Sequence, residues 1–343
     1  MTSAPGTPSK RRLLLIGSLA AALLAAIVAG GWWTWQRAAT PLTAKPVAVR
    51  IALPSQISAG AFFVGMDQQL FARQSLDLQP QKFLLGKDAM QAVLDGKADL
   101  AVLADTPFMF SVMRGDKIAT VSVIYGSRKT MSVVARRDRN IQTARDLQGK
   151  TIGTVFGTNN QYFLDTLLLT NGVPDDQVNV VDVKPDELIA SLRDGRLDAI
   201  TGWQPEHHKA LGDGATIMYS EDVFVFRFLL AGRQDYIDSH PEEIRRVLAG
   251  LDASIRFIQQ KPAEGKTIIG RSLGMNPAEL SHFYDPKDFS LSLNQTLLLA
   301  LGDQTRWSMN KGLAPMAAVP DYRDHIRSAP LEAVLPSAVK IIR

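Results

Sequence analysis

The sequence predicts an α/β fold built as two similar lobes, and a repeated pattern is the main observation behind this prediction. The pattern is LDGKADL at residues 94–100 and RDGRLDA at residues 193–199. Each copy follows an amphipathic stretch, holds a glycine suited to the left-handed end of a helix, and precedes an apolar run. Each copy therefore predicts a helix, a cap and a buried strand. Chance is the alternative explanation, because Asp-Gly is a common turn dipeptide.

Length and composition are a second observation that fits two domains. The chain has 343 residues with 46% apolar content, enough for a core in each lobe. Three of its four net positive charges come from Lys10, Arg11 and Arg12, so the rest of the chain is nearly neutral. We therefore expect no nucleic-acid partner. The absence of cysteine excludes disulfides, thiolate metal sites, a cysteine nucleophile and a cysteine-linked lipid anchor.

Residues 13–35 form an uncharged, largely apolar segment. As a helix it would be roughly 35 Å long, enough to cross a ~30 Å hydrocarbon core. We expect residues 1–12 in the cytoplasm, 13–35 as a single-pass anchor in the inner membrane, and 36–46 as a stiff linker to an extracytoplasmic domain. A cleaved signal peptide is the alternative, because Val28-Ala29-Gly30 suits a peptidase, although the apolar run is longer than usual.

The order of elements after the linker is β-α-β-α-β, twice, which is the third observation. It predicts two mostly parallel sheets with right-handed crossovers. We assign residues 47–135 to the first part of lobe 1, 136–222 to lobe 2, and 223–343 to the second part of lobe 1 with C-terminal helices. Residues 224–231 form an apolar strand that returns the chain to lobe 1, and Ser239 is expected to start a long helix with Pro241 in its first turn.

Catalytic motifs are missing from the sequence. The histidines follow no metal-binding spacing, and neither a nucleophile elbow nor a phosphate loop occurs. His207 and His208 are adjacent, so on a helix they diverge, and we read them as solvated. We predict no enzyme activity, no cofactor and no metal site. The five histidines are His207, His208, His240, His282 and His325.

Binding is easier to support than catalysis, because polar groups follow several predicted strands. The turn at residues 157–160 lies between a strand and a helix, where free amides and the helix dipole can hold an anion; capping by Thr158 or Asn159 is the alternative. Trp203 follows the second repeat and is expected to stack on a ligand, with burial in the core as the alternative.

Two further places could contact a ligand. Asp105 and Thr106 follow a buried strand, at the carboxyl end where ligands of α/β sheets gather, and Thr106 is expected to cap a helix that starts with Pro107. Arg128 and Lys129 lie between the lobes and could pair with an acidic group, although such residues are usually just solvated.

A series of segments in order resembles the solute-binding proteins of ABC importers in the nitrate, sulfonate, taurine and thiamine-pyrimidine group. The segments are GMDQQLF (65–71), DGKAD (95–99), DLQGKTIG (146–153), DGRLDA (194–199) and WQP (203–205). The resemblance implies a two-lobed, type II periplasmic-binding-protein-like fold with two hinge crossovers that closes on a small ligand. The ligand contacts it implies are Ser55, Gln56, Asp105, Thr106, Thr158, Asn159 and Trp203, to which the charge argument adds Arg128.

The function expected from the sequence is capture of a small organic or oxyanion ligand, of the sulfonate, taurine, nitrate or pyrimidine class. A monomer would present this ligand to ABC permease subunits on the extracytoplasmic side. Binding with lobe closure, rather than catalysis, is the expected mechanism. The alternatives are a membrane-anchored sensory module that works with a partner, and an enzyme on the same fold. The polar, uncharged loops do not identify the ligand.

Overall fold

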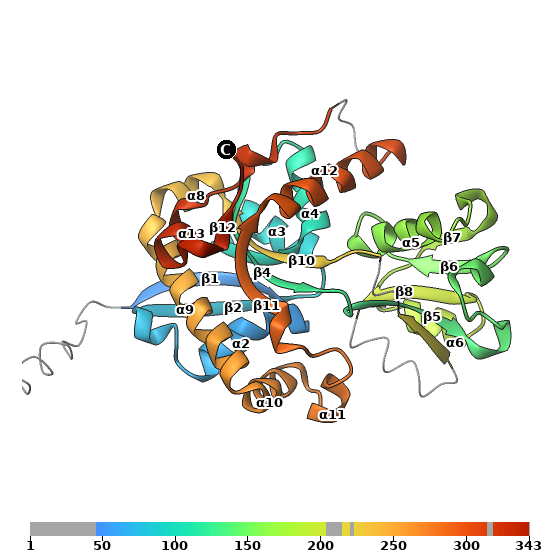
Figure 1. The fold of residues 1–343 in the computed structure, drawn as a ribbon, viewed down its shortest axis with the longest axis horizontal. Helices are drawn as coiled ribbons and strands as arrows, with labels where there is room; N and C mark the ends of the chain where they lie inside the picture. The colour runs from blue at the N-terminus through green and yellow to red at the C-terminus, as the bar shows by residue number, and fades with distance from the viewer. Residues whose placement is uncertain (1–45, 204–214, 220–222, 314–317, 343) are drawn as a thin grey trace, which may run out of the picture. The chain divides into compact units, whose positions relative to one another are not determined.

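The computed structural model describes residues 46–203, 215–219, 223–313 and 318–342. Two β-sheets, each covered by helices, make up this part of the chain (Figure 1). The predicted cytoplasmic segment, membrane anchor and nearly all of the linker lie outside the described residues. Of the helices that are described, none has both the length and the apolar character needed to cross a bilayer.

The first sheet has seven strands in the order β12-β11-β4-β10-β3-β1-β2. Strands β2, β1 and β3 are parallel to one another, whereas β10, β4 and β11 are added by antiparallel pairing. The strands are β1 Val47–Pro54, β2 Leu76–Phe83, β3 Leu100–Ala104, β4 Ile118–Ser127, β10 Phe226–Arg233, β11 Phe289–Asn294 and β12 Val339–Lys340.

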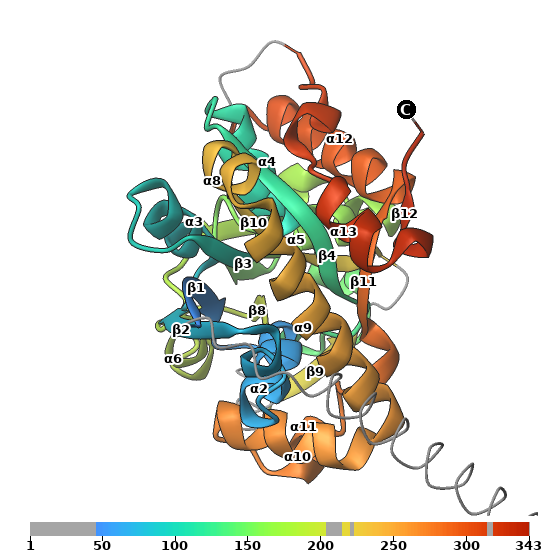
Figure 2. The same cartoon turned by 90° about the vertical axis from the view of Figure 1, so that its left-hand side faces the viewer.

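Helices from both ends of the chain pack around this sheet. Helix α9 packs against α2 and α13, and α12 packs on α4 (Figure 2). The helices are α2 Gly60–Asp67, α3 Gly86–Leu94, α4 Asp105–Met113, α8 Gln234–Ser239, α9 Pro241–Gln260, α10 Pro262–Leu273, α11 Pro277–Leu280, α12 Gln295–Asn310 and α13 Ala329–Val334. Their apolar faces and the sheet share one continuous core.

The second sheet has five strands in the order β7-β6-β8-β5-β9. Alternate residues of β5 belong to two separate apolar clusters, one beneath α5 and one beneath α6, so helices cover both faces. The elements are β5 Met131–Arg136, β6 Thr151–Thr154, α5 Asn159–Thr170, β7 Asn179–Asp182, α6 Leu188–Arg193, β8 Ala199–Trp203 and β9 Ala215–Tyr219. The chain enters this sheet between β4 and β5 and leaves it between β9 and β10.

The prediction of mostly parallel sheets was wrong, because each parallel trio is extended by antiparallel strands from elsewhere in the chain. The strand at residues 131–136, expected at the end of lobe 1, pairs with β8 and β9 in the second sheet. The returning strand is confirmed as β10, between β3 and β4. Helix α9 begins at Pro241, one residue after its cap His240, so Ser239 ends α8 instead of starting α9.

The repeated pattern forms the same structure in both sheets. Gly96 and Gly195 have φ values of 71° and 75°, the left-handed conformation that ends each preceding helix. Three residues later, the Asp99 carboxylate accepts a hydrogen bond from the Arg50 amide of β1 at 2.8 Å. The Asp198 carboxylate accepts one from the Thr151 amide of β6, also at 2.8 Å. Each copy therefore ties a helix end to the middle strand of the parallel trio in its sheet.

Helix α12 connects the two groups of elements, because it packs on α4 and also bonds to α5. The Tyr162 hydroxyl donates to Asp303 at 2.7 Å, and the Trp307 indole donates to Asp165 at 2.8 Å. The rings of Tyr162 and Trp307 also meet edge to face, with centroids 5.1 Å apart. These contacts hold α5, whose amino end reaches the site described below.

Replacing Gly96 with alanine is expected to lower the free energy of unfolding by roughly 1–2 kcal/mol, because a side chain disfavours positive φ. An added Cβ would meet nothing closer than 3.6 Å, so the loss is conformational rather than steric. Chemical denaturation measures the change. Gly302→Ala in α12 is the control, where φ is not positive and alanine is the better helix former. Equal effects of the two substitutions would contradict this account.

Candidate ligand-binding site

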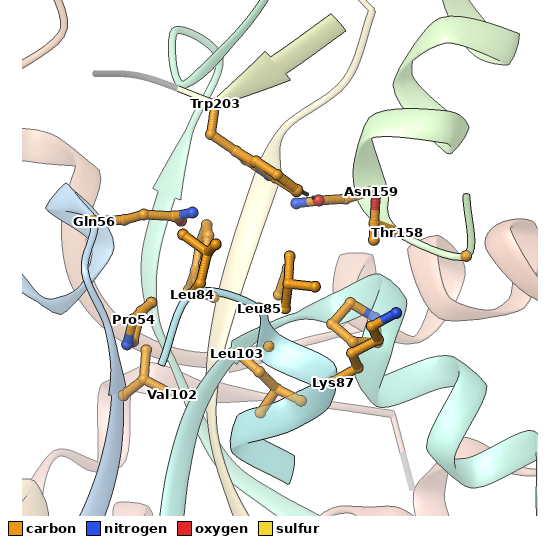
Figure 3. A pocket seen from close by; sticks show the side chains of 15 residues that line it. Pro54, Gln56, Leu84, Leu85, Lys87, Val102, Leu103, Thr158, Asn159 and Trp203 are labelled. Atoms are coloured by element: carbon orange, nitrogen blue, oxygen red, sulfur yellow. Dashed lines mark hydrogen bonds between the residues drawn. The ribbon is translucent and has the colours of Figure 1, made fainter. Parts of the chain in front are cut away.

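A cavity lies where strands of both sheets end, and side chains from both sheets line it (Figure 3). It contains about 430 Å³ of space free of protein atoms, open solvent included. Gly157, Thr158, Asn159 and Trp203 come from the second-sheet side. The first-sheet side contributes Pro54, Gln56, Leu84, Leu85, Gly86, Lys87, Val102, Leu103, Ala104, Pro107 and Phe228. We call this space the central cavity.

Trp203 forms one wall of the central cavity at the end of β8. Its indole N–H donates to the Asn159 side-chain oxygen at 3.0 Å, as Figure 3 shows. The ring also packs against both apolar clusters of the second sheet. The indole is therefore held in one orientation while part of its surface remains in the cavity. Trp203 therefore packs in the apolar core and also lines the central cavity.

The opposite wall is apolar and comes from the first sheet. Leu84 and Leu85 follow β2 and point toward the Trp203 side of the cavity, with Val102 and Leu103 of β3 beneath them (Figure 3). The Leu84 side chain is 56% exposed. An exposed leucine beside an indole is suited to the organic part of a ligand, because contact there removes apolar surface from water.

Lys87 is the cation of the central cavity, and the sequence analysis missed it. It is the second residue of α3, where the positive end of the helix dipole disfavours a cation. Within the described part of the chain, its ammonium makes no ion pair or hydrogen bond. Lys87 is exposed, and its place on the cavity wall makes its ammonium available to an acidic group there.

The turn at residues 157–160 uses part of its hydrogen-bonding capacity internally. The Thr158 hydroxyl caps α5 by accepting from the Asn160 amide at 3.2 Å, and the Gly157 amide donates to the Gln161 side chain at 2.9 Å. The capping interpretation is therefore confirmed for Thr158. No acidic residue occupies the first turn of α5, so its amino end is left electropositive.

Four predicted contact residues line the central cavity and four do not. Gln56, Thr158, Asn159 and Trp203 come together there. Ser55 and Arg128 are exposed but lie outside the lining, and Asp105 and Thr106 are buried behind it. Thr106 does not cap α4, which begins at Asp105 after Ala104. Lys129 is also exposed and outside the lining.

Asp105 is a fully buried carboxylate whose oxygens have no hydrogen-bond partner within normal distance. Burial raises its pKa to about 6, although the nearby charge of Arg227 and the Gln304 amide oppose this shift. Because the pKa is raised above the unfolded value of 3.8, the folded state holds the proton more tightly. The stability this provides is present below about pH 4 and is lost as the pH rises through about 6.

Replacing Asp105 with asparagine should therefore stabilise the protein increasingly as the pH rises. We expect the difference in unfolding free energy between variant and wild type to grow by about 2–3 kcal/mol from pH 4 to pH 7.5. Urea denaturation at the two pH values measures it, with the exposed Asp88→Asn as the control. A difference that does not change with pH would contradict the placement of a buried, unpaired carboxylate.

The described residues contain no cluster of three or more histidine, cysteine or acidic side chains that could hold a metal. None of the residues that line the central cavity there is a histidine or an acid. His207 and His208 lie outside the described residues. Within the described lining, Lys87 is the residue that carries a charge.

The chain is similar in sequence or fold to binding proteins for taurine and alkanesulfonates and to a desulfurization enzyme. The taurine-binding periplasmic protein of Escherichia coli is 22% identical over 298 residues, covering 82% of this chain and 92% of that protein. The alkanesulfonate-binding protein SsuA from Xanthomonas axonopodis, solved with MOPS, has a TM-score of 0.72 at 17% identity, covering 83% and 100%. The desulfurization enzyme DSZB has a TM-score of 0.67 at 12% identity, covering 84% and 99%.

These structural likenesses confirm the predicted two-sheet, periplasmic-binding-protein-like fold. The family model described as NMT1/THI5 like matches residues 56–265, more than half of the chain. The match includes every described second-sheet residue that lines the central cavity, together with Gln56 and Lys87 from the first-sheet side. The resemblance found in the sequence is therefore confirmed, and the chain belongs to the NMT1/THI5-like family.

Proposed function

We propose that this protein is an extracytoplasmic solute-binding protein that captures a small organic anion and presents it to an ABC importer. The observation that carries the proposal is Lys87, which makes no ion pair within the described residues and lies on the wall of a cavity that is otherwise mostly apolar. A ligand that satisfies both features has an acidic head group and an apolar body. The named relatives that bind taurine or alkanesulfonates support this assignment.

The composition of the described lining ranks the ligand classes left open by the sequence. Nitrate has no apolar part, so it would gain nothing from Leu84, Leu85 or the Trp203 ring. Taurine carries an ammonium group, and the described lining has no carboxylate to pair with it. An organosulfonate without an ammonium group fits best, because its sulfonate pairs with Lys87 and its carbon chain covers the apolar wall.

Residues 13–35 support the second part of the proposal, an anchor in the inner membrane. In this proposal, residues 1–12 remain cytoplasmic and residues 36–46 link the anchor to the binding domain. Lobe 1 comprises 47–130 and 223–343, lobe 2 comprises 131–222 because β5 pairs within the second sheet, and the two close on the ligand as a monomer. Permease subunits are the proposed partners, in preference to a sensory protein. Binding with lobe closure, rather than catalysis, is the proposed mechanism.

Butanesulfonate should bind the full chain, and Lys87→Gln should weaken that binding at least tenfold, because the substitution removes the charge that faces the sulfonate. Isothermal titration calorimetry measures both affinities. Lys340→Gln, which changes an exposed lysine of β12, is the control and should leave the affinity unchanged. Nitrate and taurine should bind more weakly than butanesulfonate.

Failure of all these anions to bind would reject the proposed ligand class. Equal binding by wild type and Lys87→Gln would instead remove Lys87 from the site. The wild-type thermal unfolding midpoint should rise with butanesulfonate, because a ligand that binds only the folded state stabilises it.

The anchor can be tested independently of the ligand. After expression in a bacterial host, the full chain should stay in the membrane pellet through an alkaline wash, because a spanning apolar helix is not displaced by pH. Intact mass should show that residues 13–35 are retained. A soluble product that begins after Gly30 would establish a cleaved signal peptide.

A further inference from the structure

A second, larger cavity opens next to the central cavity, on the second-sheet side. It contains about 1320 Å³ of space free of protein atoms, open solvent included. Its inner wall is apolar and includes Val155, Phe156, Val183 and Leu197. Its charged lining residues include Asp182, Lys184, Glu187 and Arg196. We call this space the distal crevice.

The distal crevice and the central cavity share two lining residues. Leu85 and Lys87 line both spaces, so an anion that pairs with Lys87 can extend its carbon chain toward either one. From that point, the carbon chain of a ligand can pass beneath the Trp203 ring or along the crevice. The crevice is the larger of the two spaces, at about 1320 Å³ against about 430 Å³, and therefore has more room for a long chain.

Two side chains of the distal crevice lack a structural explanation. Phe156 is 37% exposed on the wall, although the turn that carries it is fixed by a 2.9 Å hydrogen bond from its amide to Asp182. Ser191 of α6 is 98% buried, lines the crevice, and its hydroxyl has no hydrogen-bond partner. A buried hydroxyl without a partner is costly unless a ligand or water satisfies it.

The charged side chains that line the distal crevice do not close it. Arg196 is 3.5 Å from Asp194, and Lys184 is 3.9 Å from Glu187, in pairs whose side chains are more than half exposed. Exposed pairs of this kind contribute little and rearrange readily. The crevice lining therefore combines an apolar group of side chains with polar ones, which suits a carbon chain that also carries a polar group.

We infer that the distal crevice binds the carbon chain of an elongated organic anion whose acidic head group pairs with Lys87. This inference rests on the proposed function and narrows its ligand class from small sulfonates to long-chain or ring-bearing ones. Phe156 and the apolar inner wall cover the chain, and the Ser191 hydroxyl bonds to a polar group on it. Chain length, rather than the head group alone, then sets the affinity.

The test compares ethanesulfonate with octanesulfonate, which share a head group and differ in length. Calorimetry on the full chain should give octanesulfonate at least a tenfold higher affinity. Phe156→Ala should reduce this ratio at least threefold and leave ethanesulfonate binding unchanged, which also shows that the variant is folded. Leu169→Ala removes another exposed apolar side chain, 77% exposed and outside both linings, and should preserve the ratio.

Three other outcomes are decisive. Equal affinity for the two sulfonates would overturn the distal crevice as a chain site while the proposed function stands. The same follows if the ratio survives Phe156→Ala. If neither sulfonate binds and Lys87→Gln changes nothing, both the proposed function and the crevice assignment are overturned.

Discussion

The structure depends on one repeated interaction, in which an aspartate after a helix end binds the backbone of the middle strand of the parallel trio in its sheet. Asp99 and Asp198 each accept from a strand amide at 2.8 Å, and their own amides donate to the carbonyl of the same strand residue, also at 2.8 Å. Because both bonds involve one residue of the neighbouring strand, they fix the register of the parallel pair. A shift of one residue would turn every side chain to the other face.

This register determines where the central cavity forms. Strands β3 and β8 begin just after the paired aspartates and end at Ala104 and Trp203, both of which line the cavity. Each strand runs five residues from its aspartate to the cavity, so both sheets end at the central cavity. Arg233 and Arg136 strengthen the arrangement, since each donates to a carbonyl at the end of the helix that precedes an aspartate. A ligand site at these strand ends follows from the repeat rather than from the loops alone.

The sequence could predict what local patterns encode. The repeated caps, the parallel trios, the returning strand β10 and the positions of Trp203 and Thr158 all follow from nearby residues. Antiparallel additions such as β5 depend on pairing between distant segments, which periodicity does not show. Asp105 and Thr106 were misplaced because a strand end locates the backbone and not the direction of the side chain. Lys87 was missed because a single lysine shortly after two leucines matches no binding motif. Only the structure shows that its ammonium has no partner among the described residues.

The distribution of charge around the central cavity explains why it favours an anion. Helix α4 carries Asp105 in its first turn, so its positive end is already satisfied by its own chain. Helix α5 has no acid in its first turn, and its amino end lines the cavity. Lys87 adds a full charge from α3 in the same cavity. Since Asp105 lies behind the lining, its carboxylate does not compete with the ligand there, and the space between Lys87 and α5 stays positive toward a bound acid.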